Sequence, residues 1–218
     1  MTKAVIFDLD GTLIDSAPDI HAAANKVMMH RGIAPFTLEE ARSFVGHGAL
    51  VFIERCLAAR GRQAETALRD QLLADFLALY ESAVHLTKLY PGVASCLDTL
   101  TKDALPMAIC TNKPEGPTQA VLSHLGIDQK FEVIIGGDTT PKRKPDPLPL
   151  LETIARMKAT QVVFVGDSEV DSETARHAGV PFALYTEGYR KTPVDQLHHD
   201  AAFDNFAELP ALVQRLLS

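Results

Sequence analysis

The chain has 218 residues, enough for one globular core with a smaller inserted module. Of these residues 46% are hydrophobic and 22% are charged, which is typical of a globular protein. Its formal net charge is −7 with both signs interspersed, so we expect no nucleic acid partner. Three widely spaced cysteines, the lack of a long apolar segment and the acidic residues near the N-terminus predict a cytoplasmic protein without disulfide, membrane contact or signal peptide.

The first predicted element is a buried strand over residues 4–7 that ends in two carboxylates. Asp8 and Asp10 follow the apolar run, and a glycine and a threonine follow them. In extended backbone these two side chains project to the same side, at the end of the strand where open α/β sheets bind ligands. Two charges about 4 Å apart repel by about 4 kcal/mol at an effective dielectric constant near 20, so a cation or shared proton is expected there. The alternative is an ordinary polar strand exit in which Asp8 caps a neighbouring group.

Four helices and no strand are predicted over residues 16–86. Ser16 is the expected N-cap of the first helix, and Thr37-Leu-Glu-Glu40 is typical of a capping box that begins the second. The third helix is expected to follow Gly48, and the fourth carries apolar residues at helical spacing. The expected ends of the first, third and fourth helices are about Arg31, near Gly61 and about His85.

From residue 90 onward predicted helices and strands alternate, which is typical of a parallel sheet with helices on both faces. The strands are expected at 106–110, 132–135, 162–165 and 182–185, and the helices at 93–102, 115–125, 147–157, 170–178 and 208–217. The first strand belongs to the same sheet. We therefore predict an α/β fold, a Rossmann-like parallel sheet core formed by residues 1–15 and 88–218, with residues 16–87 inserted as a four-helix cap.

Polar residues follow three of these strands, and parallel strands place such ends at one edge of the sheet. The segments are Asp8 to Asp10, Thr111-Asn112-Lys113, and Gly166-Asp167-Ser168 with Asp171 one helical turn later. A basic loop, Lys142-Arg143-Lys144-Pro145, lies between the last two. Each segment alone has an ordinary explanation as a helix cap, a turn or a solvated loop. Their order along the chain favours one shared site.

These segments resemble the four motifs of the haloacid dehalogenase-like hydrolases. The motifs are Asp8-Leu-Asp-Gly-Thr12, Thr111-Asn112, Lys144-Pro145 and Gly166-Asp167-Ser168-x-x-Asp171, and the likeness covers essentially the whole chain. Within that superfamily the chain most resembles phosphoglycolate phosphatases, through Asp15-Ser-Ala-Pro-Asp19 and the cap segment Arg42-Ser-Phe-Val-Gly-His-Gly-Ala49. His47 stands where an asparagine is expected and Glu169 where an arginine is expected, which leaves the substrate open.

The resemblance implies a phosphatase that works through an aspartyl phosphate. Asp8 is the expected nucleophile, and Asp10 is the expected general acid and then general base. Thr111 and the backbone N–H of Asn112 would hold phosphoryl oxygens, and Lys144 would neutralise charge on Asp8 and on the transferring group.

A divalent cation is also expected, because several carboxylates around a phosphate dianion repel one another strongly. Oxygen ligands without histidine favour Mg²⁺ over zinc. By resemblance the carboxylates of Asp8 and Asp167 and the backbone carbonyl of Asp10 hold the metal. Asp171, with Ser168, would orient metal-bound water behind them.

The cap is expected to close over the non-phosphate end of a small phosphorylated metabolite. Arg42, with Gly46, His47 and Gly48, would hold a substrate carboxylate, which points to 2-phosphoglycolate. The alternatives are that Arg42 only pins two helices together and that the glycine-flanked loop is a flexible turn.

Other functions within the same resemblance stay open. Asp10 argues against a dehalogenase, the cap does not resemble that of a phosphomutase, and a catalytically dead binding module would have lost one of the motif aspartates. Pyrophosphatase, nucleotidase and sugar-phosphatase activities are not separated by the sequence, because a few cap side chains can change the substrate. Both a monomer and a homodimer are compatible with the chain.

Overall fold

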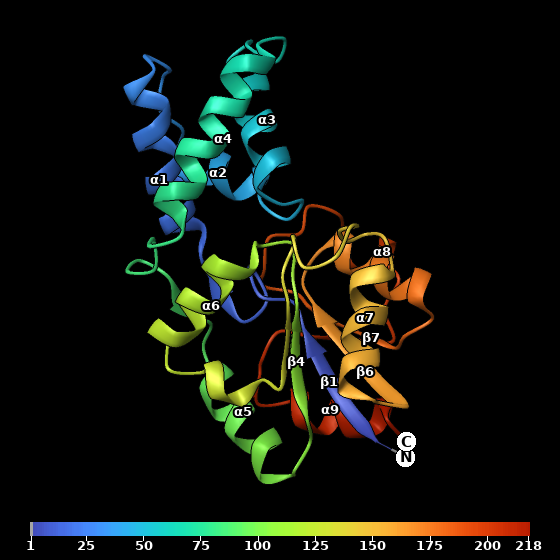
Figure 1. The fold of residues 1–218 in the computed structure, drawn as a ribbon. Helices are drawn as coiled ribbons and strands as arrows, with labels where there is room; N and C mark the ends of the chain where they lie inside the picture. The colour runs from blue at the N-terminus through green and yellow to red at the C-terminus, as the bar shows by residue number, and fades with distance from the viewer. Residues whose placement is uncertain (1) are drawn as a thin grey trace.

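Six parallel strands form the central sheet in the computed structural model, which describes residues 2–218 (Figure 1). The strands are β1 (Lys3–Phe7), β4 (Met107–Cys110), β5 (Val133–Ile135), β6 (Gln161–Gly166), β7 (Phe182–Tyr185) and β8 (Ala201–Phe203). Their spatial order is β5-β4-β1-β6-β7-β8, so β1 pairs with β4 on one side and with β6 on the other. The predicted α/β fold with a parallel sheet is confirmed.

Helices cover both faces of this sheet. They are α5 (Val93–Lys102), α6 (Glu115–His124), α7 (Leu148–Met157), α8 (Glu169–Ala178) and α9 (Leu209–Leu216). Val5 and Phe7 of β1 pack in a buried cluster with residues of α5, α6 and α9. Ala4 and Ile6 point to the opposite face and pack with residues of α7 and α8. This arrangement explains the uninterrupted apolar run of β1, which is buried on both sides.

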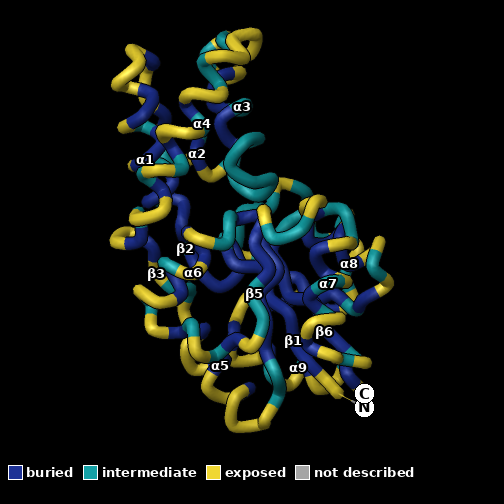
Figure 2. The backbone as a smooth tube through the Cα atoms, in the orientation of Figure 1, coloured by how far each residue is buried: buried dark blue, intermediate teal, exposed yellow. Residues whose placement is uncertain are grey.

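Four further helices form the cap, which has a hydrophobic cluster of its own. They are α1 (Ala17–His30), α2 (Leu38–Phe44), α3 (Ala49–Ala58) and α4 (Thr66–Tyr80). The rings of Phe52, Phe76 and Tyr80 stack with centroids 5.4 Å and 5.0 Å apart, which joins α3 to α4. Figure 2 shows buried stretches along these helices and exposed residues at the turns farthest from the central sheet. Among the residues described, none of the helices is long and apolar enough to cross a bilayer.

A short antiparallel ladder lies where the chain passes between core and cap. It consists of β2 (Ile14–Asp15) and β3 (Lys88–Leu89), with Ile14 opposite Leu89 and Asp15 opposite Lys88. Strands of two residues leave no periodic pattern, so the ladder was not predicted. The three-residue β8 and the 3₁₀ turns Asp128–Lys130 and Val194–Gln196 were missed for the same reason.

Two sequence predictions in the cap were wrong in detail. Helix α4 ends at Tyr80 rather than near His85, because the N–H groups of Leu86 and Thr87 donate to the Asp19 carboxylate at 3.0 Å and 2.7 Å instead of continuing a helix. Ser16 occupies the N-cap position of α1, but its hydroxyl makes no cap bond and donates to Asp10. The capping box at the start of α2 is confirmed.

Candidate active site

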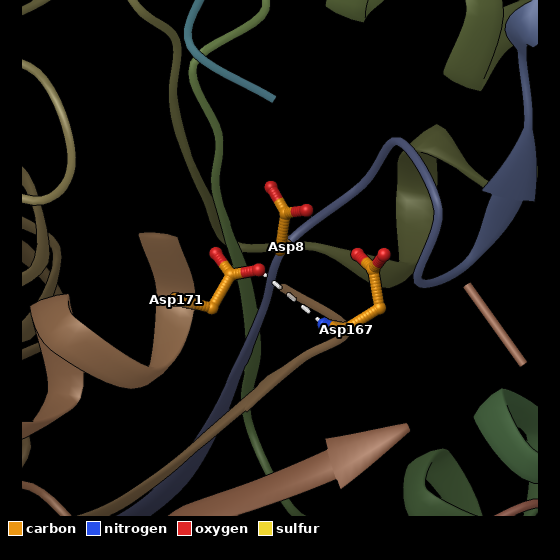
Figure 3. A group of neighbouring side chains, drawn as sticks. All are labelled: Asp8, Asp167 and Asp171. Atoms are coloured by element: carbon orange, nitrogen blue, oxygen red, sulfur yellow. Dashed lines mark hydrogen bonds between the residues drawn. The ribbon is translucent and has the colours of Figure 1, made fainter. Parts of the chain in front are cut away.

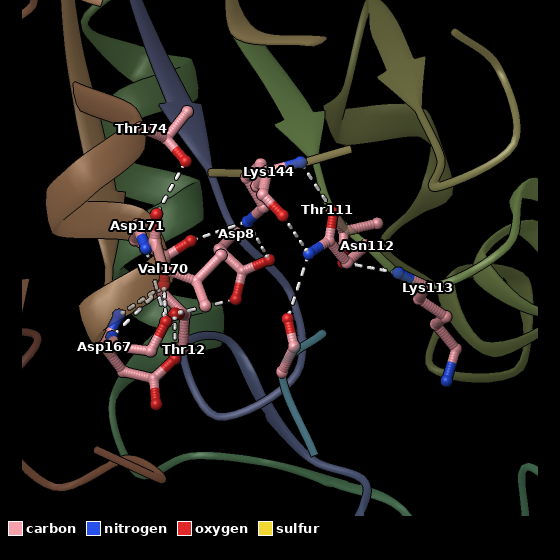
Figure 4. A network of polar contacts seen from close by, with 12 residues as sticks. Asp8, Thr12, Thr111, Asn112, Lys113, Lys144, Asp167, Val170, Asp171 and Thr174 are labelled. Carbon is pink, nitrogen blue, oxygen red and sulfur yellow. Dashed lines mark hydrogen bonds and ion pairs between the residues drawn. The ribbon is translucent and has the colours of Figure 1, made fainter. Parts of the chain in front are cut away.

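The carboxyl ends of β1, β4 and β6 meet at one edge of the sheet, beneath the cap. Asp8 follows β1, Thr111 follows β4 and Asp167 follows β6, and all three side chains are buried. Lys144 and Asp171 lie beside them, as Figure 4 shows. These residues line a cavity of about 340 Å³ whose opposite walls come from the cap. The structure therefore brings together the predicted groups that follow separate strands.

Lys144 joins two of the buried aspartates. Its Nζ lies 2.7 Å from Oδ1 of Asp8 and 2.6 Å from Oδ1 of Asp171. Burial opposes the charge on this lysine, but attraction to Asp171 and Asp8 outweighs it and raises the pKa of Lys144. Of its basic neighbours, Lys142 is exposed, and Arg143 donates from Nε to the Gly137 carbonyl at 2.7 Å. Lys144 is thus the cation of this loop that contacts the candidate nucleophile.

Three carboxylates, those of Asp8, Asp167 and Asp171, lie close enough to share a cation. One oxygen from each lies within 4.8 Å of the others, and Figure 3 shows them facing a common space. Both oxygens of Asp171 are already engaged, one by Lys144 and the other by the hydroxyl and N–H of Ser168 at 2.6 Å and 3.1 Å. Lys144 and Ser168 thus hold Asp171 in place beside Asp8 and Asp167, which stay the predicted metal ligands.

The position of Asp167 is fixed from several sides. Its Oδ1 accepts a hydrogen bond from the Thr12 hydroxyl at 2.9 Å, and its Oδ2 accepts one from the Tyr189 N–H at 2.5 Å. Gly11 has a φ of 90°, and a Cβ there would lie 2.5 Å from Oδ2 of Asp167. The glycine of the first motif is therefore required both by backbone conformation and by space.

The acidic cluster is electrostatically unfavourable when all its members are ionised. Burial, with the Asp171 charge, raises the pKa of Asp8 to about 7 even though Lys144 lowers it. Burial and the charges of Asp171 and Asp8 also raise the pKa of Asp167. A divalent cation at this point would offset the repulsion, and carboxylate and carbonyl oxygens are the ligands that Mg²⁺ prefers. The residues present therefore fit a site for a divalent cation with oxygen ligands.

Asn112 connects three segments around the site. Its side chain amide donates to the carbonyls of Gly46 and Lys144 at 3.0 Å and 2.9 Å, and its Oδ1 accepts from the Lys144 N–H at 3.0 Å. The side chain therefore holds the lysine loop and the cap loop in place. The hydroxyl of Thr111 lies beside it and accepts from the Lys113 N–H at 3.2 Å.

Asp10 has a neighbour that sequence reasoning did not select as a site residue. Its Oδ1 accepts a 2.5 Å hydrogen bond from Ser16, and Lys113 Nζ lies 3.4 Å from the same oxygen. Lys113 also donates to the hydroxyl of Tyr80, at the end of cap helix α4. Burial lowers the pKa of this lysine, and Asp10 opposes that shift. The one signal in the sequence was its place directly after Thr111-Asn112.

The cap residues predicted to face the substrate are divided by the structure. Gly46, His47 and Gly48 line the cavity. Arg42 does not: its Nη2 lies 2.6 Å from Oδ2 of Asp15, at the connection between core and cap. The structure therefore corrects the expectation that Arg42 faces the substrate, because Arg42 pairs with Asp15 and does not line the cavity. The alternative, in which Arg42 pins two helices together, also differs from the structure, because Asp15 belongs to β2 and the ion pair joins α2 to that strand.

Comparison with known proteins identifies the class to which this fold and site belong. The family model for haloacid dehalogenase-like hydrolases matches residues 5–185, and the chain belongs to that family. Relatives over nearly the whole length are named phosphoglycolate phosphatase. The one from Rhodobacter capsulatus is 47% identical over 98% of both chains, and the one from Rhodospirillum rubrum is 40% identical over 96% of this chain and 90% of its own. A crystal structure described as a predicted phosphoglycolate phosphatase from Haemophilus somnus superposes with a TM-score of 0.90 at 30% identity, covering 97% of each chain.

Proposed function

We propose that the chain is a Mg²⁺-dependent phosphatase that hydrolyses 2-phosphoglycolate to glycolate and phosphate through a phosphorylated Asp8. The observation that carries this proposal is the buried ion pair of Asp8 with Lys144 at the base of the cavity, with the second motif carboxylate, Asp10, lining the same cavity. The names of the full-length relatives support the choice of substrate.

Two displacements at phosphorus account for the reaction. In the first, a carboxylate oxygen of Asp8 forms a bond to phosphorus while the bond to the ester oxygen breaks, and Asp10 gives its proton to the leaving alkoxide of glycolate. In the second, a water oxygen attacks the phosphorus of phosphorylated Asp8, and Asp10 takes the proton from that water. The Asp8 carboxylate is regenerated, and inorganic phosphate leaves.

The surrounding residues supply charge and position. Lys144, which contacts Asp8, would neutralise both Asp8 and the phosphoryl oxygens. Thr111 and Asn112 line the same cavity, and the Thr111 hydroxyl and the N–H of Asn112 would donate to those oxygens. Mg²⁺ bound by the carboxylates of Asp8 and Asp167 and the carbonyl of Asp10 would offset the negative charge that gathers at the reacting phosphoryl group. Asp171, held by Ser168 and Lys144, orients these groups from behind.

The cap, residues 16–87, acts in this proposal as a lid. Gly46, His47 and Gly48 supply its wall of the cavity, and the hydrogen bond from Asn112 to Gly46 joins it to the core when the lid is closed. Closure excludes bulk water from the phosphorylated enzyme until the second step. The predicted cytoplasmic location and the choice between monomer and homodimer stay predictions.

A phosphate-release assay with Mg²⁺ tests the proposal. The panel contains 2-phosphoglycolate, p-nitrophenyl phosphate, pyrophosphate, glucose 6-phosphate, AMP and glycerol phosphate. We expect 2-phosphoglycolate to have the highest kcat/KM. A clear preference for a sugar phosphate or a nucleotide would overturn the substrate but keep the phosphatase. Absence of phosphate release from every compound would overturn both.

A further inference from the structure

Three basic side chains line the cavity on walls separate from the acidic cluster. His47 lies in the loop between α2 and α3, Arg55 lies on α3, and Lys191 lies in the core loop that follows β7. None of the motifs that placed the candidate catalytic residues includes Arg55 or Lys191. The proposed phosphoryl transfer therefore assigns no role to the positive charge of Arg55 and Lys191 in this cavity.

Arg55 and Lys191 are held beside each other by one helix end. Arg55 donates from Nη1 to the carbonyl of Phe44 at 3.0 Å, and Lys191 donates from Nζ to the carbonyl of Ser43. These carbonyls are consecutive and belong to the last turn of α2, where a helix leaves carbonyl groups unpaired and carries partial negative charge. Helix α2 thus fixes a cap arginine and a core lysine next to each other.

Neither cation has an acidic partner. Five of the six arginines in the cap form an ion pair with a carboxylate, namely Arg31, Arg42, Arg60, Arg62 and Arg69. Within residues 2–218, Arg55 is the cap arginine that does not, and Lys191 has no carboxylate within ion-pair distance either. The carboxylate of Glu169 accepts from the N–H groups of Lys191 and Thr192 at 2.7 Å and 2.5 Å, so it holds the loop backbone rather than a cation.

The pKa shifts of His47 and Lys191 indicate a site in which burial and positive charge outweigh the nearby carboxylate of Glu169, which acts in the opposite direction on both groups. Burial lowers the pKa of His47, and the charges of Arg55 and Lys191 lower it further. Burial and the charge of Arg55 also lower the pKa of Lys191. The Nδ1 atom of His47 is buried and has no hydrogen-bond partner among the described residues. A buried polar atom of this kind normally meets a partner, and here the cavity is beside it.

We propose that Arg55 and Lys191, with His47, form a subsite that binds the carboxylate of the substrate while its phosphoryl group lies at Asp8. This inference rests on the proposed function and deepens it by naming residues that select an acidic substrate. The guanidinium group offers the remaining N–H donors of its fork to a carboxylate, and the ammonium group adds a second charge. The cavity of about 340 Å³ lies within the size range of small-molecule sites, so it has room for a substrate that carries both anions.

The subsite also couples binding to lid closure. Arg55 belongs to the cap and Lys191 to the core, so a carboxylate contacts both only when the cap lies against the core as it does here. A ligand that binds one arrangement better shifts the population toward it. A neutral alcohol tail makes no such contact and would give no equivalent closure.

Comparison of 2-phosphoglycolate with ethyl phosphate tests the subsite, because ethyl phosphate keeps the two-carbon ester and lacks the carboxylate. The ratio of kcat/KM for the two compounds is measured in wild type, Arg55→Met, Lys191→Met and Arg42→Met. We expect Arg55→Met to lower the ratio at least ~30-fold, as loss of a charged hydrogen bond would, and Lys191→Met to lower it to a similar extent. Arg42→Met is the matched control, since it removes a cap arginine that pairs with Asp15, and it should keep the wild-type ratio.

The outcomes separate this inference from the proposed function. The subsite would be overturned if Arg55→Met and Lys191→Met lost equal activity on both substrates. It would also be overturned if the ratio fell as far in Arg42→Met. In either case a wild type that prefers 2-phosphoglycolate would still support the proposed function. A wild type that does not prefer 2-phosphoglycolate to ethyl phosphate would overturn both. Turnover of ethyl phosphate by each variant shows that the variant has folded.

Discussion

At the scale of single residues, Asp8 is the group on which the proposed covalent chemistry depends. Asn at position 8 keeps the size and much of the hydrogen bonding but cannot act as an anionic nucleophile. We expect Asp8→Asn to lower phosphate release by at least ~10⁴-fold while leaving a cooperative unfolding transition in circular dichroism. Activity within tenfold of wild type would contradict the covalent mechanism.

Lys144 and Lys142 form a matched pair for a second residue-scale prediction. Lys144 is buried and contacts Asp8 and Asp171, whereas Lys142 is exposed two residues away on the same loop. We expect Lys144→Ala to cost about 2–4 kcal/mol in transition-state stabilisation, measured as the loss of kcat/KM, and Lys142→Ala to cost much less. A larger loss in Lys142→Ala than in Lys144→Ala would show that the assignment of the phosphoryl contact to Lys144 is wrong.

Whether a site residue could be predicted depends on whether a local sequence pattern or the packing of distant elements sets its position. Asp8, Thr111 and Asp167 follow apolar strands of one parallel sheet, so their convergence follows from local pattern and topology. Arg42 and Arg55 both lie on cap helices, and which of them faces the cavity depends on how α2 and α3 pack against the core. No local pattern in the sequence records that packing.

At the scale of elements, α2 links helix capping to the proposed subsite. Thr37 accepts from the Glu40 N–H at 3.1 Å, and the Glu40 carboxylate accepts from the Thr37 N–H at 2.8 Å. We expect Thr37→Ala to lower the free energy of unfolding by about 1 kcal/mol in a denaturant titration, and Thr37→Ser to stay close to wild type. No change in Thr37→Ala would show that the box adds nothing to the stability of the cap.

The larger elements were predictable because each carries a continuous apolar signal. Helix α5 occupies the predicted residues 93–102, and β7 the predicted residues 182–185. The two-residue strands β2 and β3 carry no such signal, and the early end of α4 depends on Asp19, which lies far away in the sequence. Elements fixed by long-range hydrogen bonds therefore appear only in the folded chain.

At the scale of the whole molecule, metal removal should abolish activity. The buried carboxylates cannot hold a phosphate dianion unaided, so EDTA should stop phosphate release and added Mg²⁺ should restore it. Ca²⁺, which is larger and less strict in geometry, should substitute poorly. Undiminished turnover after exhaustive metal removal would contradict the metal assignment.

The free energy of unfolding should depend on pH because of the buried Asp8 carboxylate. The pKa of Asp8 rises from 3.8 to about 7 on folding without metal, so the folded protein retains a proton that the unfolded chain has lost between these values. The free energy of unfolding of the metal-free protein should therefore fall as the pH rises through that window. Mg²⁺, which competes with this proton, should raise Tm more at pH 8 than at pH 5. An equal rise at both values would contradict metal binding at Asp8.

The central claim, a phosphoryl group carried by Asp8, is tested most directly by trapping it. Asp10→Asn lacks the base for the second step, and p-nitrophenyl phosphate has a leaving group that departs without help from an acid. The variant is mixed with this substrate and Mg²⁺, quenched in acid, digested and analysed by mass spectrometry. We predict a burst of p-nitrophenol equal to the enzyme concentration and one phosphoryl group on the peptide that contains Asp8. Release of p-nitrophenol without phosphorylation of that peptide would contradict the account.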